Sequence, residues 1–212
     1  LETNRSPIMS IPQKPEKSNL IERTAKSIFN LPNIITMARI LFVPLFIWTL
    51  VEFSNPESPM RWISVLTFII IMASDGVDGA IARKRGLITN LGKLLDPIAD
   101  KALLGGALVT LSVLGEVSWW VTAIIMVREL GITAYRFVVI RKEVVAASSG
   151  GKLKTIFQGI MVGFVVSPLT AWFGDWYLIF ESALVFFATF LTVTTGVQYM
   201  YAAARARRDR IK

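Results

Sequence analysis

The sequence predicts an all-α integral membrane protein with six transmembrane helices in one compact domain. Of its 212 residues, 53% are hydrophobic and only 18% are charged, and the mean hydropathy is +0.55. Soluble domains rarely combine so much apolar content with so little charge. The apolar residues also stand in runs of the length needed to cross a bilayer, which is about 20 residues. These runs cover 33–53, 61–82, 94–115, 117–140, 156–174 and 176–202.

The distribution of charge predicts how these helices are oriented. The short segments that join successive pairs on one side are acidic, with Arg61 as the nearby cation. The other side carries basic residues at 83–85, 93, 141–142, 152, 154 and in 205–212. By the positive-inside rule, we expect a multi-pass protein of the cell membrane with both termini in the cytoplasm.

The two ends of the chain differ from the membrane domain expected at 19–204. Residues 1–18 are polar and rich in Pro, Lys and Ser, which predicts a disordered tail, and 205–212 form a basic C-terminal tail. Residues 19–29 fit a short juxtamembrane amphipathic helix with Asn19 as N-cap and Glu22 completing a capping box. A solvated linker is the alternative for this segment.

The chain contains no cysteine and no histidine. Disulfides, thiolate metal sites and a cysteine nucleophile are therefore excluded, and so is the usual base at neutral pH. Any chemistry must come from carboxylates, lysines, arginines, hydroxyls and a bound metal ion. The net charge of +8 favours anionic lipids or phosphates as partners.

Four acidic residues interrupt the apolar pattern at one end of the second and third predicted helices. Asp75 and Asp78 are three residues apart, and Asp96 and Asp100 are four apart, so each pair shares a helix face. The topology brings both pairs to the same membrane depth on the cytoplasmic side. Carboxylates gathered in this way repel one another, and a divalent cation relieves the repulsion. Ligation by oxygen alone favours magnesium, manganese or calcium over zinc.

The alternative is that these acids form structural ion pairs. Basic residues stand close to them in the sequence, namely Arg83, Lys84, Lys93 and Lys101. Because all four acids sit on faces that the topology turns toward each other, the metal interpretation is favoured.

The same residues form a longer pattern, D-x2-D-G-x2-A-R-x8-G-x3-D-x3-D. Its positions are Asp75, Asp78, Gly79, Ala82, Arg83, Gly92, Asp96 and Asp100. This pattern resembles the signature of the CDP-alcohol phosphotransferases, and the six-helix prediction agrees with that family over 30–204.

The resemblance implies an enzyme that transfers the phosphatidyl group of a CDP-linked lipid to an alcohol and releases CMP. Asp75, Asp78 and Asp96 would bind two divalent ions, Mg2+ or Mn2+, and Asp100 would add a ligand and act as the general base. The nucleotide would lie against residues of three segments: Asn33, Thr36, Gly79, Ala82, Arg83 and Gly92. Relatives form homodimers, so a homodimer is expected.

Other segments resemble one branch of the family, the phosphatidylglycerophosphate synthases, whose acceptor is glycerol 3-phosphate. They are 30–39, 127–130 with Arg136, and 151–158. An acceptor phosphate needs a cationic pocket. The candidates for that pocket are Arg39, Arg128, Arg136, Ser148, Lys152, Lys154 and Thr155.

Each of these assignments has a structural alternative. Lys152 and Lys154 could serve as positive-inside anchors, and Arg128 could pair with a neighbouring acid. Arg39 could extend to the membrane interface. Asn33 and Thr36 could cap the first helix instead of contacting nucleotide.

Other functions also remain open at this point. Inositol phosphate is a possible acceptor, and so is phosphatidylglycerol, which would give cardiolipin. A divalent-cation transporter is the remote alternative, because four acids on facing helices can form an ion site. Nucleic acid is not expected as a partner.

Overall fold

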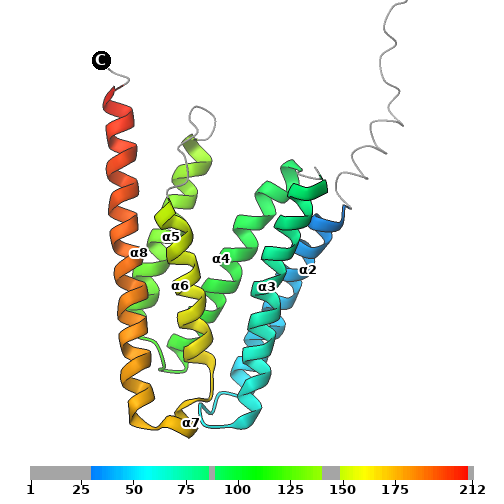
Figure 1. Ribbon diagram of the computed structural model, residues 1–212, viewed down its shortest axis with the longest axis vertical. Helices are drawn as coiled ribbons and strands as arrows, with labels where there is room; N and C mark the ends of the chain where they lie inside the picture. The colour runs from blue at the N-terminus through cyan, green and yellow to red at the C-terminus, as the bar shows by residue number, and fades with distance from the viewer. Residues whose placement is uncertain (1–29, 86–88, 140–148, 210–212) are drawn as a thin grey trace, which may run out of the picture.

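The computed structural model describes residues 30–85, 89–139 and 149–209, and every regular element in these ranges is helical (Figure 1). The predicted all-α architecture is therefore confirmed for this part of the chain. The tail expected at 1–18, the amphipathic helix expected at 19–29 and Ser148 lie outside the described residues.

Six long helices follow the six predicted apolar runs in the described ranges, with one short helix and one 3-10 turn between them. The elements are α2 (Leu31–Glu52), η1 (Pro59–Arg61), α3 (Trp62–Arg85), α4 (Asn90–Val113), α5 (Trp119–Val139), α6 (Ser149–Val166), α7 (Thr170–Phe173) and α8 (Asp175–Asp209).

The largest difference from the predicted bounds concerns the fifth run. It was expected to continue through residue 174, but α6 ends at Val166. Pro168 explains the difference, because proline disfavours a helical conformation in the residue before it. The last helix also runs further than expected, through Asp209, so most of the predicted basic tail is helical.

Side-chain caps fix the starts of α2 and α4. Asn30 caps α2, and its side chain accepts a hydrogen bond from the backbone N–H of Asn33 at 3.0 Å. The alternative in which Asn33 or Thr36 caps this helix is therefore wrong. Thr89 caps α4 in the same way, accepting from the N–H of Gly92 at 3.0 Å.

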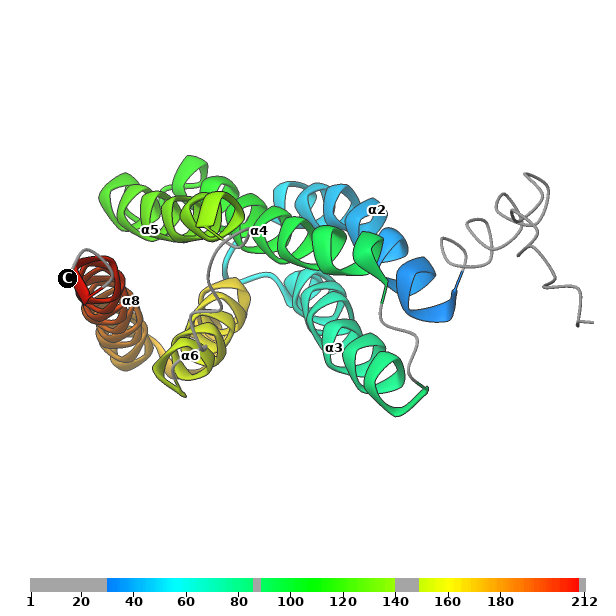
Figure 2. The same ribbon diagram turned by 90° about the horizontal axis from the view of Figure 1, so that it is seen from above.

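The helices form two groups that diverge from one end of the molecule (Figure 1). In one group, α2 packs against both α3 and α4; in the other, α5 and α6 pack against α8. Helix α4 also contacts α5, and α3 contacts α6, so the groups are joined. Seen from above, α3, α4 and α6 surround the space between the groups (Figure 2).

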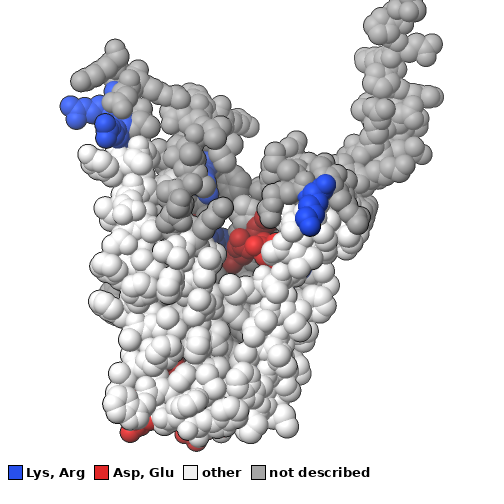
Figure 3. Space-filling model, viewed as in Figure 1, with Lys and Arg blue, Asp and Glu red and all other residues white. Residues whose placement is uncertain are grey.

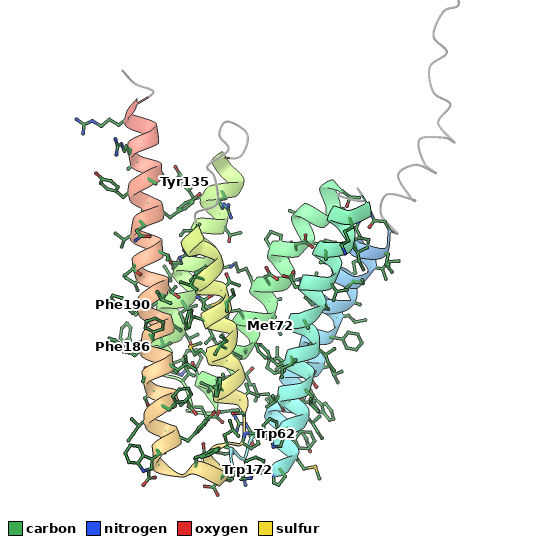
Figure 4. The ribbon with its side chains drawn as sticks, in the orientation of Figure 1. Trp62, Met72, Tyr135, Trp172, Phe186 and Phe190 are labelled. Carbon is green, nitrogen blue, oxygen red and sulfur yellow. The ribbon has the colours of Figure 1, made fainter. Side chains whose placement is uncertain are left out.

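The hydrophobic core lies where the two groups meet, which we call the closed end. Phe46, Leu50, Leu108, Leu111 and Met161 are fully buried there. Near the same end, the rings of Trp62 and Trp172 lie 6.2 Å apart (Figure 4). The opposite end has no such packing between the groups in the described part of the chain, and it is called the open end.

A buried arginine reinforces the closed end. Arg61 donates to the backbone carbonyls of Ser54 at 2.7 Å and Val166 at 2.9 Å, and it forms an ion pair with Glu116. Burial raises the pKa of the Glu116 carboxyl above its ordinary value, although the guanidinium acts in the opposite direction. Arg61 thus connects the α2–α3 loop, the α4–α5 loop and the end of α6.

Three helices of the described chain are long and apolar enough to cross a membrane: Leu31–Glu52, Pro59–Ile81 and Asp175–Arg205. Only 11% of the apolar window of the last one is buried within the protein, and Phe186 and Phe190 project outward from it (Figure 4). Such exposed apolar surface is typical of contact with lipid. The charged residues in α4 and α5 interrupt their apolar runs, and six membrane crossings stay a prediction.

Candidate functional site

Three of the four acidic residues expected to act together lie at the open end, in the cleft between the two helix groups (Figure 3). Asp75 comes from α3, and Asp96 and Asp100 come from successive turns of α4. Asp96 and Asp100 line a cavity of about 490 Å³ that extends toward α5, α6 and α8. Asp75 and Asp100 line a second cavity of about 340 Å³ that extends between α3, α4 and α6. Asp100 therefore belongs to both cavities.

Helix α2 holds these carboxylates in position through Arg39. Its guanidinium Nη1 lies 2.6 Å from Asp75 Oδ1 and 3.4 Å from Asp100 Oδ1, and its Nε donates to Ser74 at 3.3 Å. The Arg39 side chain is 1% exposed, whereas those of Asp75 and Asp100 are 49% and 46% exposed. The alternative in which Arg39 extends to the membrane interface is thus wrong, because its charge is buried among acids.

A second contact from α2 reaches Asp96. The Thr36 hydroxyl lies 3.1 Å from Asp96 Oδ1 and also 3.1 Å from the carbonyl of Pro32. Asn33, one turn earlier, accepts a hydrogen bond from the Thr89 hydroxyl at 3.0 Å. Both predicted nucleotide contacts of α2 therefore lie beside the start of α4.

The absence of a side chain at Gly92 allows this approach of α2 to α4. A Cβ atom at Gly92 would lie 2.8 Å from Asn33 Oδ1 and 3.2 Å from Thr89 Oγ1. Because both distances are shorter than ordinary contacts, glycine is required if the Asn33–Thr89 hydrogen bond is to form. The motif glycine thus has a packing role that does not depend on a ligand.

The larger cavity is lined by cations from three helices. Lys101 comes from α4, Arg128 and Arg136 from α5, and Lys154 from α6. Thr155 lines this cavity and the smaller one. We call the larger cavity the cationic cavity. Arg39 does not line it, so of the predicted acceptor-binding residues Arg128, Arg136, Lys154 and Thr155 come together there.

One buried acid joins three of these cations. Glu129 forms ion pairs with Lys101, with Arg128 at 3.0 Å and with Lys154. The side chain of Glu129 is 2% exposed. Lys154 is 5% exposed, so it does not serve as an anchor at the membrane surface. The structural ion pair considered for Arg128 is present, and Arg128 lines the cavity as well.

Several predicted side chains cannot be placed. Asp78, Ala82 and Arg83 lie on α3, and Lys152 lies on α6, but their side chains are outside the described part of the structure. Gly79 lies on α3, one turn beyond Asp75.

Five polar or charged residues that line the cationic cavity were not assigned to the site by the sequence patterns: Lys101, Glu129, Thr133, Thr195 and Tyr199. Lys101 and Glu129 are charges inside apolar runs, directly beside Asp100 and Arg128, and that position was a usable signal. Thr195, which accepts a hydrogen bond from Arg128 at 3.3 Å, and Tyr199 gave none.

Comparison with known proteins identifies the family. The family model for CDP-alcohol phosphatidyltransferase matches residues 29–196. The chain belongs to this family. The match includes α2 to α7 and the first part of α8, and every residue that lines either cavity except Tyr199.

Individual relatives are similar over nearly their whole length. A Mycobacterium tuberculosis protein named "Probable phosphatidylglycerophosphate synthase" is 40% identical over 95% of this chain and 92% of its own. The Bacillus subtilis CDP-diacylglycerol–glycerol-3-phosphate 3-phosphatidyltransferase is 38% identical over 81% of this chain and 93% of its own. A Rickettsia bellii protein of the same name is 34% identical over 83% and 96%.

Enzymes of this family generally depend on divalent metal ions. Among the described side chains, no three acids approach closely enough to form a complete metal site. The donor set nevertheless fits such an ion. Asp75 and Asp100 already face one positive centre, the Arg39 Nη1, and their oxygens are the ligands that hard divalent ions prefer.

Proposed function

We propose that this protein transfers the phosphatidyl group of CDP-diacylglycerol to glycerol 3-phosphate, giving phosphatidylglycerophosphate and CMP. The observation that carries the proposal is the position of Asp100 on the wall shared by two chemically different cavities. The smaller one is lined mostly by apolar side chains, with Asp75, Asp100, Arg39 and Lys101 at its polar part. The larger one is lined by four cations, Lys101, Arg128, Arg136 and Lys154, together with Asp96, Asp100 and Glu129. The names of the relatives that span nearly the whole chain agree with this reaction.

The smaller cavity suits the lipid donor. Asp75 and Asp100 stand at its polar part, and Phe68, Ile71 and Leu103 supply apolar walls. The pyrophosphate of CDP-diacylglycerol would lie beside the carboxylates, and the start of its lipid portion along these walls. The predicted nucleotide-binding residues are Asn33, Thr36, Gly79, Ala82, Arg83 and Gly92.

The carboxylates can bind pyrophosphate only if their own charge is neutralised. Asp75, Asp78, Asp96 and Asp100 would hold two Mg2+ or Mn2+ ions, which neutralise charge on the pyrophosphate and stabilise the leaving CMP. Arg39 keeps Asp75 and Asp100 directed toward the cleft.

The cationic cavity suits the acceptor. Its arginines and lysines would bind the phosphate of glycerol 3-phosphate, which leaves a hydroxyl of the glycerol directed toward Asp100. Ser148, Lys152 and Thr155 are proposed to add contacts. Arg39 was predicted to bind the acceptor too, but its ion pairs with Asp75 and Asp100 favour the positioning role.

Asp100 would then act as the general base. Its carboxylate takes the proton of the attacking hydroxyl, whose oxygen forms a bond to the phosphatidyl phosphorus. The bond from that phosphorus to the oxygen of CMP breaks, and CMP leaves with the electron pair. Phosphoryl transfer of this kind depends on positioning and on charge neutralisation more than on covalent participation by the protein.

The proposal includes the setting of the enzyme. The open end would face the cytoplasm, as would both termini, because the basic residues gather on that side. The six long helices would all cross the cell membrane. A homodimer is proposed from the family resemblance.

The test is CMP release by the purified protein in detergent with CDP-diacylglycerol and Mg2+. Glycerol 3-phosphate should support release, whereas inositol phosphate and phosphatidylglycerol should not. Asp100→Asn should lower the rate by about a hundredfold or more, because it removes a general base. Glu57→Gln, a change of the same kind in an exposed loop at the closed end, should leave the rate unchanged. Release with another acceptor alone would refute the assignment of the acceptor, and no release with any acceptor would refute the enzyme.

A further inference from the structure

Glu129 is the one described acid at the centre of the cations that line the cationic cavity. Oε2 pairs with Lys101 from α4, and Oε1 pairs with Arg128 from α5 and Lys154 from α6. Both carboxylate oxygens are therefore occupied, and they join side chains from three helices. With 2% of its side chain exposed, Glu129 gains little from water and depends on these partners.

The cluster keeps an excess of positive charge. The carboxylate of Glu129 faces three cations. Arg136 lines the same cavity as a fourth cation, and Asp96 and Asp100 line it beside Glu129, so the cations of the lining still outnumber the acids. Within the described part of the chain, the buried Nε of Arg128 also has no hydrogen-bond acceptor. A buried cluster of this kind is stabilised by an anion with several acceptor oxygens, and a phosphate monoester is such an anion.

The backbone of α8 supports the arrangement. A Cβ atom at Gly196 would lie 3.1 Å from Cγ of Arg128 and 3.4 Å from its Nε, so the arginine lies close against this helix. Its Nη2 donates to Thr195 at 3.3 Å, while Nη1 pairs with Glu129. Arg128 is therefore fixed along its whole length, with Glu129 determining the position of one end.

We infer that Glu129 is a positioning residue that holds Lys101, Arg128 and Lys154 in place for the phosphate of the acceptor. The inference rests on the proposed function. Without the carboxylate, three neighbouring cations repel one another, and a buried ammonium without an acid partner turns toward water or loses its proton. Without Glu129, the three cations are therefore no longer held where they can bind the acceptor phosphate, and the acceptor binds more weakly.

The experiment separates the two substrates. Glu129→Gln keeps the size of the side chain and removes its charge, so KM for glycerol 3-phosphate should rise about tenfold or more. KM for CDP-diacylglycerol should change less than about twofold, because Arg128 and Lys154 do not line the donor cavity and only Lys101 lines both. Glycerol 3-phosphate should raise the unfolding temperature of the unchanged protein and not that of the variant, whereas CDP-diacylglycerol should stabilise both.

Glu116→Gln is the matched control, because it changes a largely buried acid that pairs with an arginine at the closed end. It should leave both KM values unchanged. Glu129→Asp, which keeps the charge but is shorter, provides a second variant if Glu129→Gln does not fold, and it should also raise KM for glycerol 3-phosphate alone.

The outcomes distinguish the inference from the proposed function. If the unchanged protein releases no CMP with glycerol 3-phosphate, the proposed function fails. If it does release CMP, three results overturn the role of Glu129: an unchanged KM for glycerol 3-phosphate in the folded Glu129 variants, a lower KM, or equal increases in KM for both substrates.

Discussion

Replacement of Arg61 tests how the two helix groups are held together. This side chain is fully buried and donates to the carbonyls of Ser54 and Val166 and to the carboxylate of Glu116. Arg61→Met keeps an unbranched side chain and removes every donor. Breaking a buried ion pair costs about 3–5 kcal/mol, and each carbonyl left without a donor adds to that cost. The side chain of Glu116 is 16% exposed, so water recovers part of the loss. We expect a destabilisation of about 4 kcal/mol.

The assay is thermal unfolding of the purified protein in one detergent. For a chain of this size, 1 kcal/mol corresponds to about 2–4 °C, so the midpoint should fall by roughly 10 °C. Lys84→Met is the matched control, since it makes the same kind of change at an exposed position of α3, the helix that follows Arg61. Its midpoint should move by less than about 2 °C. Equal midpoints for the two variants would refute the view that Arg61 holds the closed end.

Two further predictions concern other parts of the fold. Gly92→Ala should lower the unfolding midpoint, because its Cβ would displace Asn33 Oδ1 from Thr89. Gly163→Ala should leave the midpoint unchanged, because its Cβ would make only an ordinary contact with Phe68 at 3.9 Å. An unfolding midpoint that is lower for Gly163→Ala than for Gly92→Ala would contradict the packing role of Gly92. Because burial raises the pKa of Glu116, its contribution to stability is present at low pH and is lost as the pH rises through that pKa. The midpoint of the unchanged protein should therefore fall relative to Glu116→Gln as the pH is raised, and a constant difference would exclude this effect.

The long helices could be predicted from the sequence because their signal is local. Each apolar run is long enough to specify a helix by itself, and all six predicted runs contain one. The error at the end of α6 was also local, since Pro168 was a usable stop signal. The divergence of the two helix groups could not be predicted, because it follows from contacts between residues far apart, such as Arg61 with Val166.

The candidate site, like the fold, could be predicted from the sequence only in part. The spacing of Asp96 and Asp100 predicts a shared face, and the topology predicts that Asp75 approaches them. The partners of these acids depend on packing that no spacing encodes. Arg39 was expected at the acceptor and lies instead between Asp75 and Asp100, 36 and 61 residues away along the chain. A single acid beside an arginine has the pattern of an ordinary ion pair, so the sequence alone does not assign Glu129 to the site.

On each side of the cleft, one buried charged residue holds several residues of the opposite charge together. On the side of α3 and α4, the buried cation Arg39 holds carboxylates that would otherwise repel one another. On the side of α5 and α6, the buried acid Glu129 holds cations that would otherwise separate. Each buried residue is outnumbered by its partners: Arg39 pairs with two acids, and Glu129 pairs with three cations. Lys101 follows Asp100 directly and joins the cations, so the two arrangements meet at one turn of α4. A hydroxyl bound from the cationic side would reach the general base at that turn, which explains why the proposed reaction needs both cavities to share Asp100.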